Sequence, residues 1–194
     1  MVQVVNLKKA FGPRVLFQDI NLKLDQGKRY GLIGANGAGK STFLKILSGE
    51  DEATEGEVQV QNGKKVGTLS QNQFAYEEYS LFDTVLLGNK RLYDAIKEKE
   101  ELYMSPEFTD EVNNRLAELE IVCVEEDPTY EYDVKITKIL EDLGFPASQH
   151  TDLMSSLTGG DKFKILLAQV LYPKPDVLFL DEPTNNLDIE TIGW

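Results

Sequence analysis

The 194-residue sequence predicts an α/β fold with a largely parallel core sheet. Three observations lead to this prediction. Short apolar runs that suit buried strands alternate with segments of helical spacing. A glycine-rich stretch at residues 34–41 lies between one such run and one such segment. Residues 177–180 are all apolar and are followed by two acids, which is typical of a buried parallel strand that ends at a polar site.

The first part of the chain predicts strands and one helix. Residues 2–7 and 17–24 are short strands with one buried face, and we expect them to form an antiparallel edge. Residues 30–33 predict a strand that ends at the glycine-rich stretch. Residues 40–47 have helical spacing, with Phe43, Leu44 and Leu47 directed inward.

Two further strands and a helical region follow. Residues 57–61 and 65–69 are candidate strands, separated by an Asn-Gly pair that favours a tight turn. Residues 83–104 predict one helix, and residues 110–120 a second, acidic helix after a Ser-Pro break. We expect these two helices to form a hairpin that projects from the core.

The last third alternates helix, loop, helix and strand. Residues 133–143 predict a helix that stops at Gly144, and a loop follows over 145–157, with His150 at its surface. Residues 161–171 predict another helix, and residues 177–180 the strand described above. We interpret the chain as one domain, 1–194, truncated at its C-terminus. Its core would be 1–82 and 172–194, and its helical subdomain 83–171, with an acidic arm at 94–133.

Composition restricts the possible classes of protein. Hydrophobic residues make up 41% of the chain, enough for a folded core. The net charge is −13, and residues 98–133 carry thirteen acids and two bases, a net of −11. This balance argues against a broad phosphate-binding face, so we expect no sequence-specific DNA partner. The absence of a long apolar run, together with the single Cys123, predicts a cytoplasmic protein without a membrane partner and with an ordinary, partly buried thiol.

Residues 34–41, Gly-Ala-Asn-Gly-Ala-Gly-Lys-Ser, match the phosphate-binding P-loop pattern at every fixed position. The glycines let backbone N–H groups turn toward phosphates, and the helix N-terminus that follows adds positive potential. We expect Lys40 to reach the β- and γ-phosphates and to take part in catalysis, and the Ser41 hydroxyl to ligate Mg²⁺. The residues expected to bind the nucleotide here are Gly34, Asn36, Gly37, Ala38, Gly39, Lys40, Ser41 and Thr42.

Two acids complete the expected nucleotide site. Asp181 and Glu182 follow the apolar run at 177–180. We expect Asp181 to hold Mg²⁺ through water and Glu182 to accept a proton from the attacking water as general base. Ordinary surface acids at a strand end are the alternative.

A second phosphate-binding end is expected where residues 157–161 precede a helix. Thr158 supplies a hydroxyl, and Gly159 and Gly160 present backbone amides. A helix cap without further function is the alternative at this position.

The order of these motifs, followed by Pro-Thr-Asn-Asn-Leu-Asp at 183–188, resembles the ATP-binding cassette (ABC) ATPases across essentially the whole chain. Residues 184–188 look like the soluble ABC-F branch. Residues 71–78 and the ending at 186–194 are similar to the YbiT-like subgroup of that branch.

This resemblance implies roles that the residues alone do not. Phe11 would stack on adenine, unless it is a core aromatic. Gln71 would ligate Mg²⁺ and sense the attacking water as a catalytic residue, unless it is a surface polar residue. Leu187 and Asp188 would form the D-loop. ATP and Mg²⁺ are the implied cofactors.

The sequence departs from the family pattern in two places. The usual Leu-Ser-Gly-Gly-Gln signature has Thr158 and Asp161 here, and Asp161 adds a negative charge near a nucleotide site. The switch histidine of the family is absent, because the sole histidine, His150, precedes the signature.

The resemblance also implies partners. ABC-F proteins carry two cassettes in one chain, so the second cassette is an expected partner, and the fragment alone is expected to be a very weak or inactive ATPase. The ribosome is the other expected partner, because the acidic segment lies where the family places an arm that reaches the E-site region of the 70S ribosome. A solvated hairpin without a partner is the alternative for this segment. The alternatives for the whole protein are the ATP-binding subunit of a transporter and a nucleotide-binding regulator without turnover.

Overall fold

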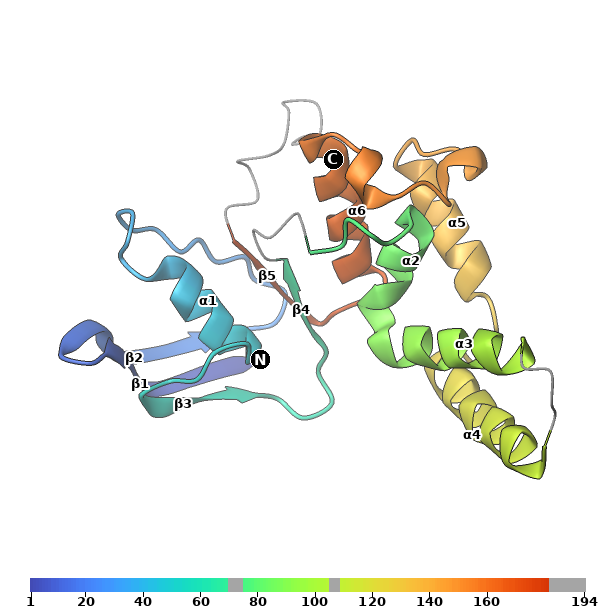
Figure 1. Ribbon diagram of the computed structural model, residues 1–194. Coiled ribbons are helices and arrows are strands. Elements are labelled where there is room, and N and C mark those ends of the chain that lie inside the picture. Colours follow the sequence, from blue (N-terminus) through green and yellow to red (C-terminus); the bar gives the residue numbers. More distant parts are fainter. Residues whose placement is uncertain (70–74, 105–108, 182–194) are drawn as a thin grey trace. The chain divides into compact units, whose positions relative to one another are not determined.

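The computed structural model describes residues 1–69, 75–104 and 109–181. The chain forms two compact units, each with its own core (Figure 1). The first unit comprises Met1–Gln71 and Lys174–Asn185, and the second comprises Asn72–Pro173 and Asn186–Trp194. The domain boundaries expected near residues 82 and 171 stay predictions.

A three-stranded antiparallel sheet forms much of the first unit. Its strands are β1 (Val2–Phe11), β2 (Arg14–Leu24) and β3 (Glu55–Val60), in the order β2-β1-β3. The predicted antiparallel edge is confirmed, and β1 runs four residues further than expected. As a result β1 and β2 meet in a tight hairpin in which Phe11 pairs with Arg14.

A parallel pair of strands forms the second sheet of this unit. It consists of β4 (Val66–Leu69) and β5 (Val177–Leu180), in register from Val66↔Val177 to Leu69↔Leu180. Among the described strands parallel pairing is limited to these two, a smaller share than the sequence suggested. The pair delivers Asp181 directly after β5, where its N–H donates to the carbonyl of Leu69 at 3.3 Å.

The strand predicted at residues 30–33 is wrong for this structure. Tyr30 and Leu32 are about half exposed, Ile33 is 95% exposed, and no strand is assigned to the run. A strand needs a neighbour that accepts and donates its ladder hydrogen bonds, and none of the described strands pairs with these residues. Apolar character alone therefore did not decide the conformation.

Helix α1 (Lys40–Ser48) covers the core of the first unit. Its buried side chains, Phe43, Ile46 and Leu47, pack with residues of β1 and with Phe179 of β5. Leu44, expected inward, is partly buried against the same cluster. The N-terminus of α1 is thereby fixed where the glycine-rich loop ends.

The second unit begins with helices α2 (Leu81–Leu86) and α3 (Lys90–Tyr103), joined by the 3₁₀ turn η1 (Leu87–Asn89). A single helix over residues 83–104 was therefore wrong. The break lies at Gly88, where a β-carbon would stand 2.0 Å from the backbone oxygen of Gln169. This close approach of two backbones requires glycine and interrupts the regular helix.

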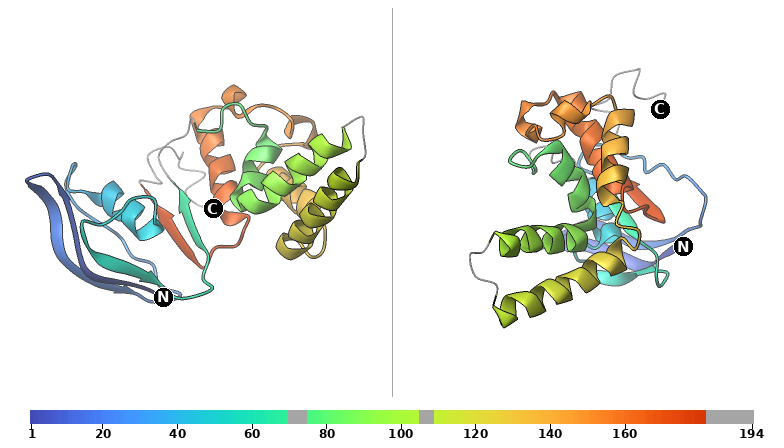
Figure 2. Two further views of the ribbon diagram at one scale, coloured as in Figure 1. Left: turned by 60° about the horizontal axis from the view of Figure 1, so that its bottom comes forward. Right: turned by 90° about the vertical axis from the view of Figure 1, so that its right-hand side faces the viewer.

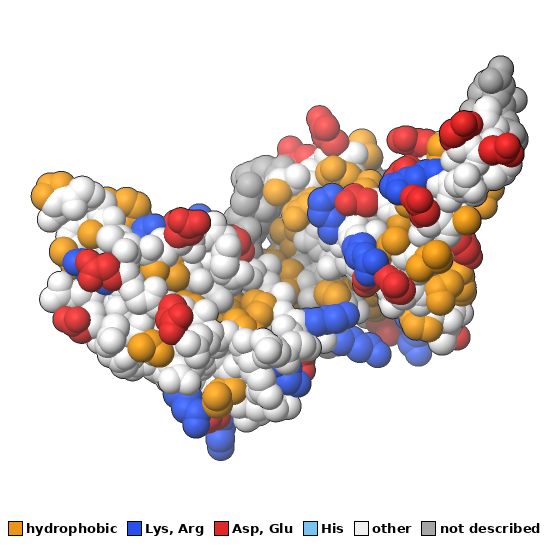
Figure 3. Space-filling model, turned by 90° about the horizontal axis from the view of Figure 1, so that it is seen from below, with side chains coloured by type: hydrophobic (Ala, Val, Ile, Leu, Met, Phe, Trp, Pro, Cys, Tyr) orange, Lys and Arg blue, Asp and Glu red, His pale blue; other side chains and the backbone are white. Residues whose placement is uncertain are grey.

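Helix α4 (Asp110–Glu126) lies beside α3 in an antiparallel hairpin, which confirms the predicted pair (Figure 2). Ion pairs link the two helices: Arg115 contacts Glu98 at 2.6 Å, Arg91 contacts Glu125 at 2.5 Å, and Lys99 contacts Glu120. Figure 3 shows acidic and basic side chains interspersed over this unit. Of the bases of α3, Arg91 and Lys99 therefore neutralise acids of α4, and α4 keeps an excess of negative charge.

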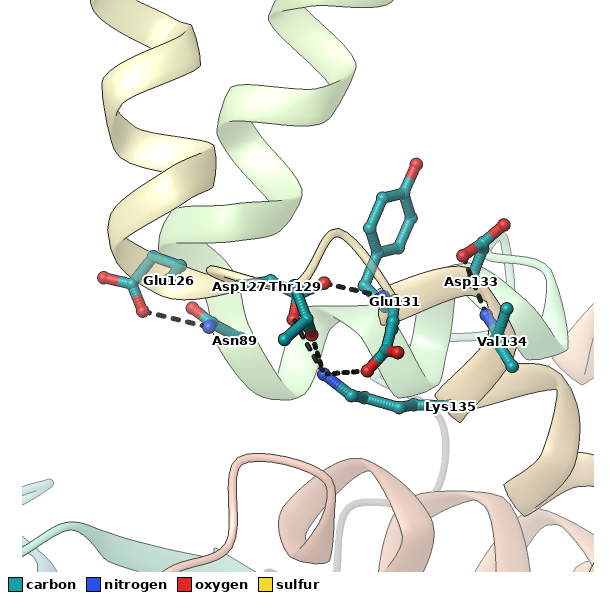
Figure 4. Close-up of polar contacts among 9 residues, drawn as sticks. Asn89, Glu126, Asp127, Thr129, Glu131, Asp133, Val134 and Lys135 are labelled. Carbon is teal, nitrogen blue, oxygen red and sulfur yellow. Dashed lines mark hydrogen bonds and ion pairs between the residues drawn. The ribbon is translucent and has the colours of Figure 1, made fainter.

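A buried carboxylate links α4 to α5 (Tyr132–Asp142). Asp127 is 5% exposed and accepts hydrogen bonds from Lys135 Nζ at 2.8 Å, the Tyr132 N–H at 2.7 Å and the Thr129 hydroxyl at 3.2 Å (Figure 4). Burial alone would raise the pKa of Asp127, but the Lys135 ammonium and backbone N–H groups outweigh burial and lower the pKa. The carboxylate is therefore charged in the folded protein, and in this form it stabilises the turn between α4 and α5.

The loop after α5 is more buried than expected. Gly144, with φ of 91°, ends α5 as predicted, and the turns η2 (Ala147–Gln149) and η3 (Met154–Ser156) precede α6 (Gly159–Leu171). His150 was expected at the surface, yet it is buried, with Nε2 at 2.9 Å from the backbone oxygen of Phe145. That hydrogen bond gives Nε2 a partner and so favours burial of the ring.

Cys123 behaves as expected from its apolar neighbours. It is buried in α4, and burial raises the pKa of its thiol. In the described residues no helix combines the length and the apolar composition needed to cross a bilayer.

Candidate functional site

The glycine-rich loop before α1 forms a turn that only glycine adopts easily. Gly37 has φ of 78°, and Gly39, the N-cap of α1, has φ of 95°. The Ala38 N–H donates to the Ala35 carbonyl at 3.1 Å, which closes the turn. Because the first N–H groups of a helix have no partners within it, α1 presents free donors and a positive end beside this loop.

The loop is packed tightly against strand β2. A β-carbon on Gly39 would stand 2.7 Å from Cδ2 of Leu16 and 3.3 Å from Cδ1 of Phe17. Phe17 in turn contacts Phe43 of α1 edge-to-face, with ring centroids 5.6 Å apart. Positive φ and close packing therefore both require glycine at position 39.

A cavity of about 670 Å³ opens beside the loop. This volume is within the range of small-molecule sites. Its lining residues are Phe11, Arg14, Leu16, Asn36, Gly37, Gly39, Lys40, Ser41 and Thr42. Of the predicted loop residues, Gly34 and Ala38 support the turn without lining the cavity, and a β-carbon on Gly34 would touch Cβ of Ala38 at 3.5 Å.

Two lining residues, Arg14 and Leu16, were missed in the sequence. Neither belongs to a recognised motif, and both come from β2, far from the loop along the chain. The signal that could have found them is the short Gly-Pro turn at residues 12–13, which brings Arg14 back beside Phe11.

Lys40 points back onto its own loop. Its Nζ donates to the carbonyl of Gly34 at 2.9 Å and to the carbonyl of Ala35 at 3.2 Å. Carbonyl oxygens are the partners an ammonium takes when no anion is close, so a phosphate can replace them. Lys40 is thus held at the cavity without a carboxylate partner among the described residues.

Phe11 lies at the cavity and is not a core aromatic. Its side chain is 56% exposed, while Phe17 takes the place in the core that was considered for Phe11. Lys9 Nζ lies 5.2 Å from the centroid of the Phe11 ring. Lys9 also contacts Asp51 at 2.8 Å, which fixes the position of its ammonium group. One face of the Phe11 ring is therefore in contact with a cation.

Ser41 and Asp181 are oxygen donors from two elements of the first unit. Ser41 is in the first turn of α1, and Asp181 directly follows β5, which packs against α1. A hydroxyl and a carboxylate are ligands of the class that Mg²⁺ prefers, so these residues fit the ion. The described residues contain no cluster of three His, Cys, Asp or Glu that would instead indicate a site for another metal.

The predicted second phosphate-binding end belongs to the other unit. Thr158 is the N-cap of α6, and Gly159 and Gly160 form its first turn. The Thr158 hydroxyl donates to Oδ2 of Asp161 at 3.0 Å, and Lys164 Nζ lies 3.0 Å from Oδ1 of the same carboxylate. The charge of Asp161, a departure from the family signature, is therefore partly neutralised within its own helix.

Four predicted residues lie outside the described part of the chain. They are Gln71, Glu182, Leu187 and Asp188. Their roles stay predictions.

The glycine loop at the N-terminus of α1, its cavity and the parallel strand followed by Asp181 define an ATP-binding cassette domain. Comparison with known families agrees. The chain belongs to the family described as "ABC transporter", which matches residues 17–185.

Comparison with curated proteins identifies relatives of this chain within the family. The chain is 48% identical over 194 residues to "Uncharacterized ABC transporter ATP-binding protein YkpA" of Bacillus subtilis, covering 100% of this chain and 36% of that protein. It is 45% identical over 189 residues to "Probable ATP-binding protein YbiT" of Escherichia coli O157:H7, covering 97% and 36%. It is 32% identical over 191 residues to "Energy-dependent translational throttle protein EttA" of Mycobacterium tuberculosis, covering 97% and 34%. The chain thus spans about a third of the length of these relatives.

These matches confirm the resemblance to ABC-F proteins of the YbiT-like kind. A solved structure confirms the fold: the ATP-binding cassette MJ0796, in a dimeric post-hydrolysis state bound to ADP and Pi, has a TM-score of 0.68. That likeness covers 98% of this chain and 78% of the other, at 20% identity.

Proposed function

We propose that the full-length protein is an ABC-F ATPase that acts as a ribosome-associated translation factor in the cytoplasm. The cavity at the glycine loop supports the ATP-binding part of this proposal. The translation part depends on the similarity to a protein named for translational throttling and on Thr-Asn-Asn-Leu-Asp at residues 184–188.

In this proposal the first unit binds ATP with adenine on Phe11 and the phosphates on the loop and on the first turn of α1. Lys40 exchanges its carbonyl partners for the β- and γ-phosphates. Ser41, Gln71 and Asp181 hold Mg²⁺, which when bound neutralises phosphate charge. Glu182 accepts the proton of the attacking water, and Gln71 orients that water.

The second unit serves the nucleotide of the other cassette. Thr158, Gly159 and Gly160 at the start of α6 present a hydroxyl and free N–H groups to its γ-phosphate. Two cassettes would therefore close around two ATP molecules, and closure is a population shift that γ-phosphate contacts favour. Hydrolysis removes those contacts and releases the ribosome.

The α3–α4 hairpin is the proposed arm toward the E-site region of the 70S ribosome. Residues 98–133 carry a net charge of −11 and cannot hold RNA by neutralising phosphates. Contact through this arm would therefore involve a ribosomal protein or groups bridged by Mg²⁺.

A second candidate is the ATP-binding subunit of a transporter. The family description and the name of the Bacillus relative favour it. Such a subunit uses the same ATP site but docks on membrane helices, so the two candidates differ in their partner and not in their chemistry.

The test uses the full-length protein with Glu182→Gln and the matching change in the second cassette. Glutamine keeps the shape of the side chain but cannot accept the proton, so the ATP-bound closed state should persist and co-sediment with 70S ribosomes. The control adds Lys40→Ala, which should abolish this ATP dependence. Binding of ATP without co-sedimentation, together with association with membrane vesicles, would instead support the transporter subunit.

A further inference from the structure

Arg14 is a charged residue of the nucleotide cavity that no motif accounts for. It opens strand β2, lies across the hairpin from Phe11 and lines the cavity together with the glycine loop. It is exposed and has no ion-pair partner among the described residues. An arginine without a partner at the wall of a cavity is available to an anionic ligand.

The register of the hairpin places Arg14 on the same side as Phe11. Arg14 is the direct cross-strand partner of Phe11, and side chains of directly opposite residues lie on the same face of a sheet. Both residues line the cavity, together with Leu16 of β2, whose Cδ2 would be 2.7 Å from a β-carbon on Gly39. Arg14 therefore lies on the cavity side of the sheet, at the hairpin end of β2.

The cavity is lined by two cations that come from different elements. Lys40 belongs to the loop, next to Ser41 and Thr42, and Arg14 lies beside Phe11. If adenine stacks on Phe11 and the terminal phosphates occupy the loop, the guanidinium is closest to the phosphate adjoining the ribose. A guanidinium matches the geometry of phosphate oxygens and pairs with two of them at once.

We propose that Arg14 binds the α-phosphate of the nucleotide and so contributes to affinity for both ATP and ADP. This inference depends on the proposed nucleotide site in the first unit and is independent of the ribosomal partner. Because ATP and ADP share the α-phosphate, the contact adds equally to the binding of each. It also leaves the choice between adenine and guanine unchanged, since no base atom is involved.

The test is isothermal titration of the full-length protein with ATP, ADP and GTP. Arg14→Gln should raise the Kd for ATP and for ADP by the same factor, about tenfold, as expected for loss of a charge-assisted hydrogen bond. Arg14→Lys should lose less nucleotide affinity than Arg14→Gln, because lysine keeps the positive charge although it cannot form the bidentate contact. The effect should decrease as salt rises.

Two variants serve as controls. Arg29→Gln removes the same charge from an exposed residue of the same unit that does not line the cavity, and it should leave both Kd values unchanged. Lys40→Ala removes the phosphate contact of this site, so the binding that remains in this variant is the nucleotide bound at the second cassette. The role of Arg14 would be overturned if Arg14→Gln left the Kd values for ATP and ADP unchanged. It would also be overturned if the variant changed only the preference for ATP over GTP. Failure of the unaltered protein to bind nucleotide above the Lys40→Ala background would overturn the site itself.

Discussion

Lys164 lies one helical turn after Asp161 in α6, with Nζ 3.0 Å from Oδ1 of the carboxylate. The pair is part-exposed, so it contributes little to stability, at most about 1 kcal/mol. Its importance is local, because it reduces a negative charge at a helix N-terminus that we propose to bind phosphate.

We therefore expect opposite effects from the two partners. In the full-length protein Asp161→Gln should lower the ATP concentration for half-maximal hydrolysis about two- to fivefold, and Lys164→Gln should raise it by a similar factor. The double variant should lie near the unaltered protein, since both charges are gone. Equal effects of the same sign would show that charge at this position is not what matters.

Gly88→Ala should destabilise the protein. A β-carbon would stand 2.0 Å from the carbonyl oxygen of Gln169, and neither backbone can yield without disturbing η1 or α6. Overpacking of this kind lowers the free energy of unfolding by about 1–3 kcal/mol or more. Denaturant unfolding measures the loss, and Gly31→Ala is the control: its β-carbon meets no atom within 4 Å, so a change of less than about 1 kcal/mol is expected.

Asp127→Asn should cost stability at neutral pH and little in acid. The folded-state pKa of Asp127 lies below its ordinary value of 3.8. A depressed pKa means that the stabilisation is fully present above this ordinary value and is lost as pH falls through the folded pKa. At neutral pH the loss should be about 1–3 kcal/mol. Unfolding curves of both proteins at neutral pH and at a pH below the folded-state pKa of Asp127 test this, and a difference independent of pH would contradict it.

Cys123 should react slowly with iodoacetamide in the native protein. The thiol is 5% exposed and burial raises its pKa, so little thiolate is present and reagent reaches it only through local opening. We expect alkylation at least about tenfold slower than in denaturant, measured by mass spectrometry. Equal rates would place the thiol at the surface.

The elements with a clear local pattern could be predicted from the sequence. The spacing of Phe43 and Leu47 predicted α1, and Gly144 predicted the end of α5, because apolar periodicity and positive φ are properties of a few neighbouring residues. The turn of the glycine loop followed from its own residues in the same way.

Features that depend on distant residues could not be predicted. The break at Gly88 is caused by Gln169, and the burial of His150 by the carbonyl of Phe145 in a folded loop. Ile33 was assigned to a strand from its apolar neighbours, although pairing is what makes a strand. Arg14 reaches the cavity only because β2 returns along β1, which no motif records.

The parallel pairing of β4 with β5 sets the order in which the chain can fold. Lys65 and Asp176, at the start of this pairing, are hydrogen-bonded although 111 residues separate them. During synthesis β4 leaves the ribosome long before β5 exists, so it must wait unpaired while the intervening helices emerge. Those helices make mostly local contacts and fold fast, whereas closing so long a loop is slow. We therefore expect the inserted helical unit to fold first and to bring the two ends of the split first unit together.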